Sequence, residues 1–227
     1  MNAITKIFKM KSKQLFKEYG FKTYNSYFYR KINNVFQSVC LHSSVSGQDC
    51  VTEFALLPLC ISYPLSKSSC GTYTVRQFYN QYSWYQFEKN NEKSMQLCAD
   101  TMLKDIIQYL VPFFEKSINS QKSYAALCQF EREHFKDGIV MASAEKAFFA
   151  LDAGYYDKAQ CHIEAMIHQN ETAYQRNKEV FGNELPEAYT EKVFKGIEYW
   201  KELNAKVKSK DIPWIKELLW KNEQNNL

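Results

Sequence analysis

Glycine and proline are scarce in this chain, with 7 glycines and 5 prolines among 227 residues. These numbers are low for an all-β protein and for a disordered chain, and they favour helix. They also leave few glycine-rich loops of the kind that cradle phosphate groups. The G-x-G-x-x-G and P-loop patterns are absent, so the sequence argues against nucleotide-dependent catalysis.

Long apolar runs and a strong charge excess are also missing. The longest apolar run, "FALLPLCISYPL", has 12 residues, whereas a membrane-spanning helix needs about 20. Lysines interrupt the N-terminal apolar residues, so no signal peptide is expected. The 29 cations and 25 anions give a formal net charge of +4, which is short of the basic footprint of a dedicated nucleic-acid domain. These features predict a cytoplasmic protein without a membrane span.

The seven cysteines are odd in number and contain no C-x-x-C pair, so the sequence predicts reduced thiols and no cysteine-based metal site. Glu131 and His134 form one Glu-x-x-His motif, whereas di-iron bundles need two such motifs and further carboxylates. A solvated helix face is the favoured interpretation there. No metal or cofactor is predicted.

The first half of the chain alternates between helical and strand patterns. Apolar spacing predicts a helix over 4–19 that ends at Gly20. Aromatic and β-branched residues then predict strands separated by asparagine turns at 25–26 and 33–34. The run 50–63 is apolar on both faces, as in a central strand, and a further strand is expected over 72–79.

From about residue 91 the apolar period becomes helical. A long helix with an irregularity at Pro112 comes first, and further helices are expected over 123–135, 143–154, 156–177, 186–208 and 213–222. The sequence thus predicts an α+β fold in two parts. Residues 1–120 form an α+β domain with an antiparallel sheet of about four or five strands, and residues 121–227 form an all-helical bundle.

Two segments resemble known families. The "YGF" at 19–21, the "FYR" at 28–30 and the "VFQSVCLHSS" at 35–44 resemble the uncharacterised bacterial domain-of-unknown-function 4304 family over residues 8–118. That resemblance implies an α+β domain with an antiparallel sheet and carries no established activity. Residues 144–167 look like one tetratricopeptide-type helix pair. Because such arrays need at least three repeats, a helical hairpin of a small bundle is favoured.

The stretch "SYFYRKINNVF" contains most of the candidate binding residues. In a strand, Tyr27, Tyr29 and Lys31 face one way, whereas Phe28, Arg30 and Ile32 face the other. We expect the face of Phe28 and Ile32 to pack inward, and the alternation alone leaves the reverse orientation open. The aromatic and basic side chains suggest a binding surface. With one tryptophan from a predicted loop, the candidates are Tyr27, Tyr29, Arg30, Lys31 and Trp84. A platform that stacks single-stranded nucleic acid is one alternative, although no companion strand of that type is evident.

The other alternative is a thiol-dependent enzyme that uses Cys70 and His42. A nucleophilic cysteine needs a base within hydrogen-bond reach and a third orienting group, and the spacing indicates neither. With catalytic motifs absent, the favoured function is a non-enzymatic binding or adaptor role toward another protein. An immunity protein against the toxin of a competing bacterium is a subclass of that role.

Overall fold

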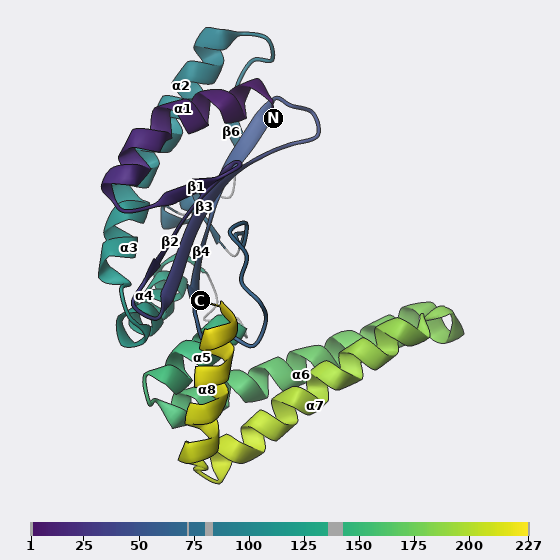
Figure 1. Ribbon diagram of the computed structural model, residues 1–227. Helices are drawn as coiled ribbons and strands as arrows, with labels where there is room; N and C mark the ends of the chain where they lie inside the picture. Colours follow the sequence, from purple (N-terminus) through teal and green to yellow (C-terminus); the bar gives the residue numbers. More distant parts are fainter. Residues whose placement is uncertain (1, 72, 80–83, 136–142, 227) are drawn as a thin grey trace. The chain divides into compact units, whose positions relative to one another are not determined.

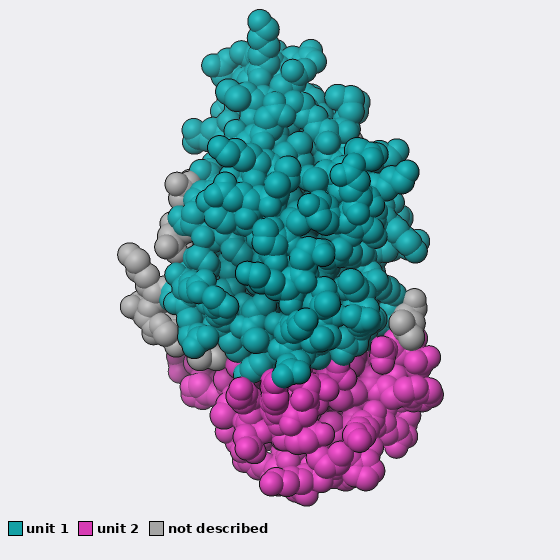
Figure 2. Space-filling view, turned by 90° about the vertical axis from the view of Figure 1, so that its left-hand side faces the viewer, with its two compact units in different colours: residues 1–59, 63–139, 226 teal, residues 60–62, 140–225, 227 magenta. Residues whose placement is uncertain are grey.

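The computed structural model describes residues 2–71, 73–79, 84–135 and 143–226 (Figure 1). The protein has an α+β fold, as the sequence predicts. The chain divides into two compact units (Figure 2): residues 1–59, 63–139 and 226 form the first, and residues 60–62, 140–225 and 227 form the second.

Within the described residues, the first unit contains one antiparallel sheet of six strands, in the order β1-β2-β3-β4-β5, with β6 also paired to β4. The strands are β1 (Lys22–Tyr24), β2 (Tyr27–Ile32), β3 (Val35–Ser43), β4 (Asp49–Pro58), β5 (Tyr73–Thr74) and β6 (Tyr85–Gln86). Asn25 and Asn33 have positive φ angles of 51° and 49° at the two tight turns, which asparagine tolerates. The predicted sheet and turns are confirmed.

The strand expected over 72–79 is largely wrong, because β5 ends at Thr74. A 3₁₀ helix, η1 (Val75–Tyr79), follows it. The Gln77 side chain accepts a hydrogen bond from the Thr74 backbone N–H at 2.7 Å, which favours a turn at this point. Position 72 lies outside the described residues.

Helices cover one face of the sheet. Helix α1 (Ala3–Glu18) begins at an Asn2 cap and ends before Gly20, whose φ is +77°. Its Phe8 and Phe16 rings contact Phe28 of β2, at centroid distances of 6.3 and 4.3 Å. Figure 1 shows α2 (Glu92–Asp105) on the same side of the sheet as α1. This packing confirms that Phe28 faces inward.

The predicted irregularity near Pro112 is confirmed. A π-helical segment, η2 (Ile106–Leu110), connects α2 with α3 (Val111–Lys116). The Val111 backbone N–H donates to the Ile106 carbonyl, five residues earlier. Proline has no N–H to donate and its ring crowds the preceding turn, and a wider turn is a known way to accommodate such a break.

An aromatic cluster fills the core between the sheet and the later helices. Phe54 of β4 lies 5.5–6.0 Å, between ring centroids, from five other aromatic rings: Tyr73, Phe78, Phe113, Phe114 and Phe130. Phe130 comes from α4 (Ser120–His134). This helix therefore belongs to the first unit, and the chain divides after it rather than at residue 120.

The second unit is helical. It contains α5 (Ala144–Asp152), α6 (Tyr156–Phe181), the short 3₁₀ helix η3 (Gly182–Glu184), α7 (Glu187–Lys208) and α8 (Ile212–Asn226). Gly154, with φ +76°, allows the tight turn between α5 and α6, so the expected hairpin is confirmed. The buried side chains include Phe148, Phe149, Ile163, Trp200 and Leu203.

No helix among the described residues combines the length and apolarity that crossing a membrane requires.

Candidate functional site

Strands β3 and β4 bring reactive side chains together on the sheet face opposite α1 and α2. Cys40 and His42 are two residues apart in β3, so both side chains leave the same face. Glu53 of β4 pairs directly with Cys40, and Tyr27 of β2 pairs with Cys40 on its other side. A row of Tyr27, Cys40 and Glu53 therefore crosses the sheet, with His42 beside it.

The segment 63–71 runs across this face and adds a second thiol. The Ser38 hydroxyl of β3 donates a hydrogen bond to the Ser69 carbonyl. Next to it, the Cys70 Sγ donates to the backbone carbonyl of Glu53 at 3.3 Å. We call Cys40, His42, Glu53 and Cys70 the Cys40 cluster.

Gly71 lets the segment pass close to the Glu53 carboxylate. Its φ is +99°, a conformation that L side chains rarely adopt, and an added Cβ would lie 3.1 Å from Glu53 Oε2. Glycine is therefore favoured at position 71 for two reasons: the backbone has a positive φ, and a side chain would crowd the Glu53 carboxylate.

The potential ligand atoms of the cluster lie close to one another. One atom each from Cys40, His42 and Glu53 falls within 4.8 Å of the other two. Cys40 Sγ is 3.9 Å from Glu53 Oε2, and His42 Nδ1 is 3.8 Å from Glu53 Oε1. Burial is graded, because Cys40 is 1% exposed whereas the His42 side chain is 57% exposed. The cluster can be reached from solvent on its His42 side.

The electrostatics favour a protonated Cys40. The hydrogen bond with the Cys70 thiol raises the pKa of Cys40, and burial and the nearby Glu53 carboxylate raise it further. Burial also raises the pKa of Tyr27, with smaller contributions from the same thiols and carboxylate. An activated nucleophile needs a lowered pKa instead, so the free Cys40 thiol is not prepared for catalysis.

The arrangement can hold a metal ion. Sulfur, imidazole nitrogen and carboxylate oxygen are the ligands that Zn²⁺ takes, and in tetrahedral sites they lie about 3.3–3.8 Å from one another. The observed separations are up to about 1 Å wider than this. The ligand atoms would have to move together by about that amount when an ion binds. His42 is exposed, so a change of its rotamer can supply this movement.

Comparisons with protein-family models, with curated proteins and with solved structures found no match to this chain. The two family resemblances stay predictions.

The prediction that Arg30 belongs to a binding surface is wrong. It is 9% exposed and faces the helices. Its guanidinium donates to Gln37 Oε1 at 2.7 Å and to the Tyr19 carbonyl at 2.6 Å, and it forms an ion pair with Glu115 at 2.6 Å. These contacts occupy the arginine in the interior, so it supports the fold rather than a binding surface.

Of the other predicted binding residues, Tyr27, Tyr29 and Lys31 lie on one face of β2, and Trp84 lies next to a different strand. Tyr27 and Tyr29 are half-buried, and the Tyr29 ring stacks on Phe36. Lys31 is exposed on the same strand. Trp84 is 40% exposed and directly precedes β6, where its carbonyl accepts a hydrogen bond from Arg76.

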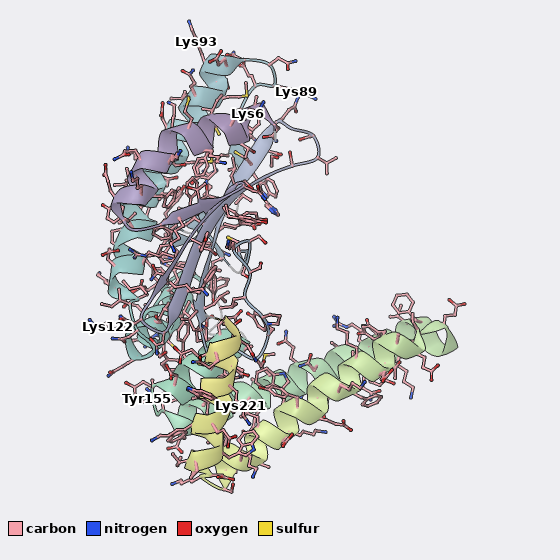
Figure 3. All side chains as sticks on the ribbon, viewed as in Figure 1. Lys6, Lys89, Lys93, Lys122, Tyr155 and Lys221 are labelled. Atoms are coloured by element: carbon pink, nitrogen blue, oxygen red, sulfur yellow. The ribbon has the colours of Figure 1, made fainter. Side chains whose placement is uncertain are left out.

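The labelled lysines of the first unit lie at its two ends, with Lys6 and Lys89 at the same end as Lys93 (Figure 3). Figure 3 shows Lys93 and Lys122 at opposite ends of the unit, on α2 and α4.

Of the two cations of β2, Arg30 is turned inward and Lys31 is exposed, and Lys22 of β1 pairs with Tyr29 beside it. The nucleic-acid alternative stays a prediction.

In the structure, His42 and Cys70 both contact Glu53. His42 lies next to its carboxylate, and the Cys70 thiol donates to its backbone carbonyl. Sequence reasoning missed Cys40 and Glu53. The usable signal was the Cys-x-His alternation in a predicted strand, which puts both side chains on one face. Strand pairing, which selects Glu53, was not readable from one sequence.

In the Glu131 and His134 motif, Glu131 is buried and His134 is half-buried, contrary to the sequence interpretation of a solvated face. Glu131 is 7% exposed and accepts a hydrogen bond from the Tyr73 hydroxyl at 3.1 Å. His134 packs against the Phe130 ring at a centroid distance of 4.9 Å. The motif therefore ties α4 to the aromatic core.

Proposed function

We propose that this protein binds a zinc-type divalent ion at the Cys40 cluster and acts as a binding protein rather than as a catalyst. The observation that carries the proposal is the close approach of three different ligand atoms, one each from Cys40, His42 and Glu53, within 4.8 Å. Thiol and imidazole ligands favour zinc over magnesium and calcium, which prefer oxygen ligands.

Cys70 supplies the fourth ligand in this proposal. Its Sγ lies outside the 4.8 Å group of the other three and donates to the Glu53 carbonyl at 3.3 Å, so it would turn toward the ion from beside Cys40. Four protein ligands describe a closed, structural zinc site, whereas catalytic zinc keeps one position open for water. A closed site would fasten the segment 63–71 to β3 and β4 and so fix the shape of this sheet face. The role that follows is metal-dependent presentation of a surface.

A partner protein is the proposed target, and the helical hairpin of α6 and α7 offers it a contact. Val180 and Phe181, at the end of α6, are 68% and 54% exposed, and Phe194 on α7 is 46% exposed. Exposed aromatic side chains are frequent anchors of protein interfaces. This supports the adaptor role, of which toxin immunity remains a subclass.

Metal titration tests the proposal. Apo protein should bind one equivalent of Zn²⁺, and Co²⁺ in its place should give the visible absorption of a tetrahedral thiolate site. Binding should weaken as the pH falls, because the thiols must lose their protons. The raised pKa of Cys40 strengthens that dependence.

Matched variants identify the ligands. Cys40→Ser and His42→Gln should each reduce Zn²⁺ affinity by at least about tenfold, whereas Cys128→Ser and His168→Gln, which change the same residue types elsewhere, should leave it unchanged. Failure of the unaltered protein to retain Zn²⁺ would refute the proposal. Equal affinity in the Cys40→Ser variant would do the same.

A further inference from the structure

A second group of sulfur atoms lies on the other face of β4. Cys50 Sγ is 3.7 Å from Cys98 Sγ and 3.7 Å from Met102 Sδ. Cys98 and Met102 are four residues apart on α2 and so share one face of that helix. Their exposures are 0% for Cys50, 6% for Cys98 and 0% for Met102. We call these three residues the sulfur triad.

The spacing of the triad suits a shared ion better than a disulfide. Three sulfur ligands that lie about 2.3 Å from one ion, in a plane around it, are about 4.0 Å apart, which is within about 0.3 Å of the observed 3.7 Å. A disulfide needs about 2.05 Å between the sulfurs, so both side chains would have to close a much larger gap. An ion can bridge the two thiols with little movement.

The chemistry of the triad selects a soft ion. Thiolate and thioether sulfurs prefer Cu(I), and the methionine is a poor ligand for harder ions. Arg76 is the cation whose charge acts on Cys98.

We propose that Cys50, Cys98 and Met102 form a buried three-sulfur site for Cu(I). Binding of one Cu⁺ ion releases the thiol protons of both cysteines to solvent, and no oxidant or reductant is involved. Two thiolates and one Cu⁺ carry a net charge of −1, which the nearby Arg76 cation partly balances. The site is separate from the Cys40 cluster and does not depend on the zinc proposal.

Anaerobic titration with Cu(I) against a chromogenic Cu(I) chelator tests the site. The unaltered protein and the Cys128→Ser variant should retain one equivalent of Cu(I). Cys98→Ser should lose it, and Met102→Leu, which conserves volume and so should fold, should bind at least about tenfold more weakly. An unfolding curve for each variant separates lost binding from lost structure.

Two results would overturn the proposal. One is that the unaltered protein gives up all its Cu(I) to the chelator. The other is that Met102→Leu retains full affinity while Cys40→Ser loses it, which would place the copper in the Cys40 cluster. Zinc titration of the same samples keeps the two proposals apart, because each site has its own variants.

Discussion

At the scale of single residues, Gly71 controls the environment of Glu53. The prediction is that Gly71→Ala destabilises the first unit by about 1–3 kcal/mol through backbone strain and also weakens Zn²⁺ binding, because the new methyl group displaces the carboxylate. Gly47→Ala is the matched control, since Gly47 also has a positive φ, of +68°, but nothing within 4 Å of an added Cβ.

Urea unfolding and Zn²⁺ titration of both glycine variants provide the measurement. Gly47→Ala should show the strain alone, with zinc affinity unchanged. If the two variants lose the same stability and both keep full zinc affinity, then the close approach of Gly71 to Glu53 has no role in the site.

The sequence predicted single residues correctly where local patterns determine their conformation. It failed where the pairing of strands determines which residues are neighbours. The inward orientation of Phe28 and the turn at Asn33 followed from alternation and turn chemistry. The proximity of Cys40 to Glu53 did not, because it depends on the register of two strands that are joined by a turn of unknown geometry. Cys70 reaches the pair only through the fold of a long loop.

At the scale of elements, the hairpin of α6 and α7 has side chains of two kinds. Some are buried and stabilise the second unit, and others are exposed and available to a partner. Phe148, on the neighbouring α5, is 0% exposed, and its ring lies 6.0 Å from Trp200 of α7. We predict that Phe148→Ala lowers the free energy of unfolding by about 3–5 kcal/mol. Phe181→Ala, at an exposed position, should change it by less than about 0.5 kcal/mol.

A pull-down with nuclease treatment completes this test. A protein partner captured by the unaltered chain should be lost with the Phe181→Ala variant if the hairpin end is the contact, while folding stays intact. Capture of the same partner by both proteins would remove Phe181 from the interface, and a large loss of stability in the Phe181 variant would show that the ring is packed.

The helices were the most predictable elements, because their apolar spacing repeats over many turns. The short strands β5 and β6 were harder, since each has two residues and carries no usable period. The 3₁₀ helix η1 replaced a predicted strand because Phe78 packs into the aromatic core and Gln77 caps the turn. Such tertiary contacts override local β propensity.

At the scale of the whole molecule, one buried and one half-buried histidine link stability to pH in both units. Burial lowers the pKa of His134 in the first unit. Burial, with a smaller contribution from the charge of Lys146, lowers the pKa of His162 in the second unit from 6.5 to about 4. Both shifts have the same sign, so acid should weaken the fold as a whole.

The shift at His162 gives a measurable pH dependence. Between pH 6.5 and about 4 the unfolded chain binds this proton while the folded protein does not, so stability falls as the pH falls through this window. From pH 7 to 5 the loss should be about 2 kcal/mol. His162→Leu should remove that part of the dependence, whereas His168→Gln, an exposed position on the same helix, should retain it. Urea unfolding at both pH values measures the difference, and an unchanged pH profile in His162→Leu would show that this histidine is charged in the folded protein.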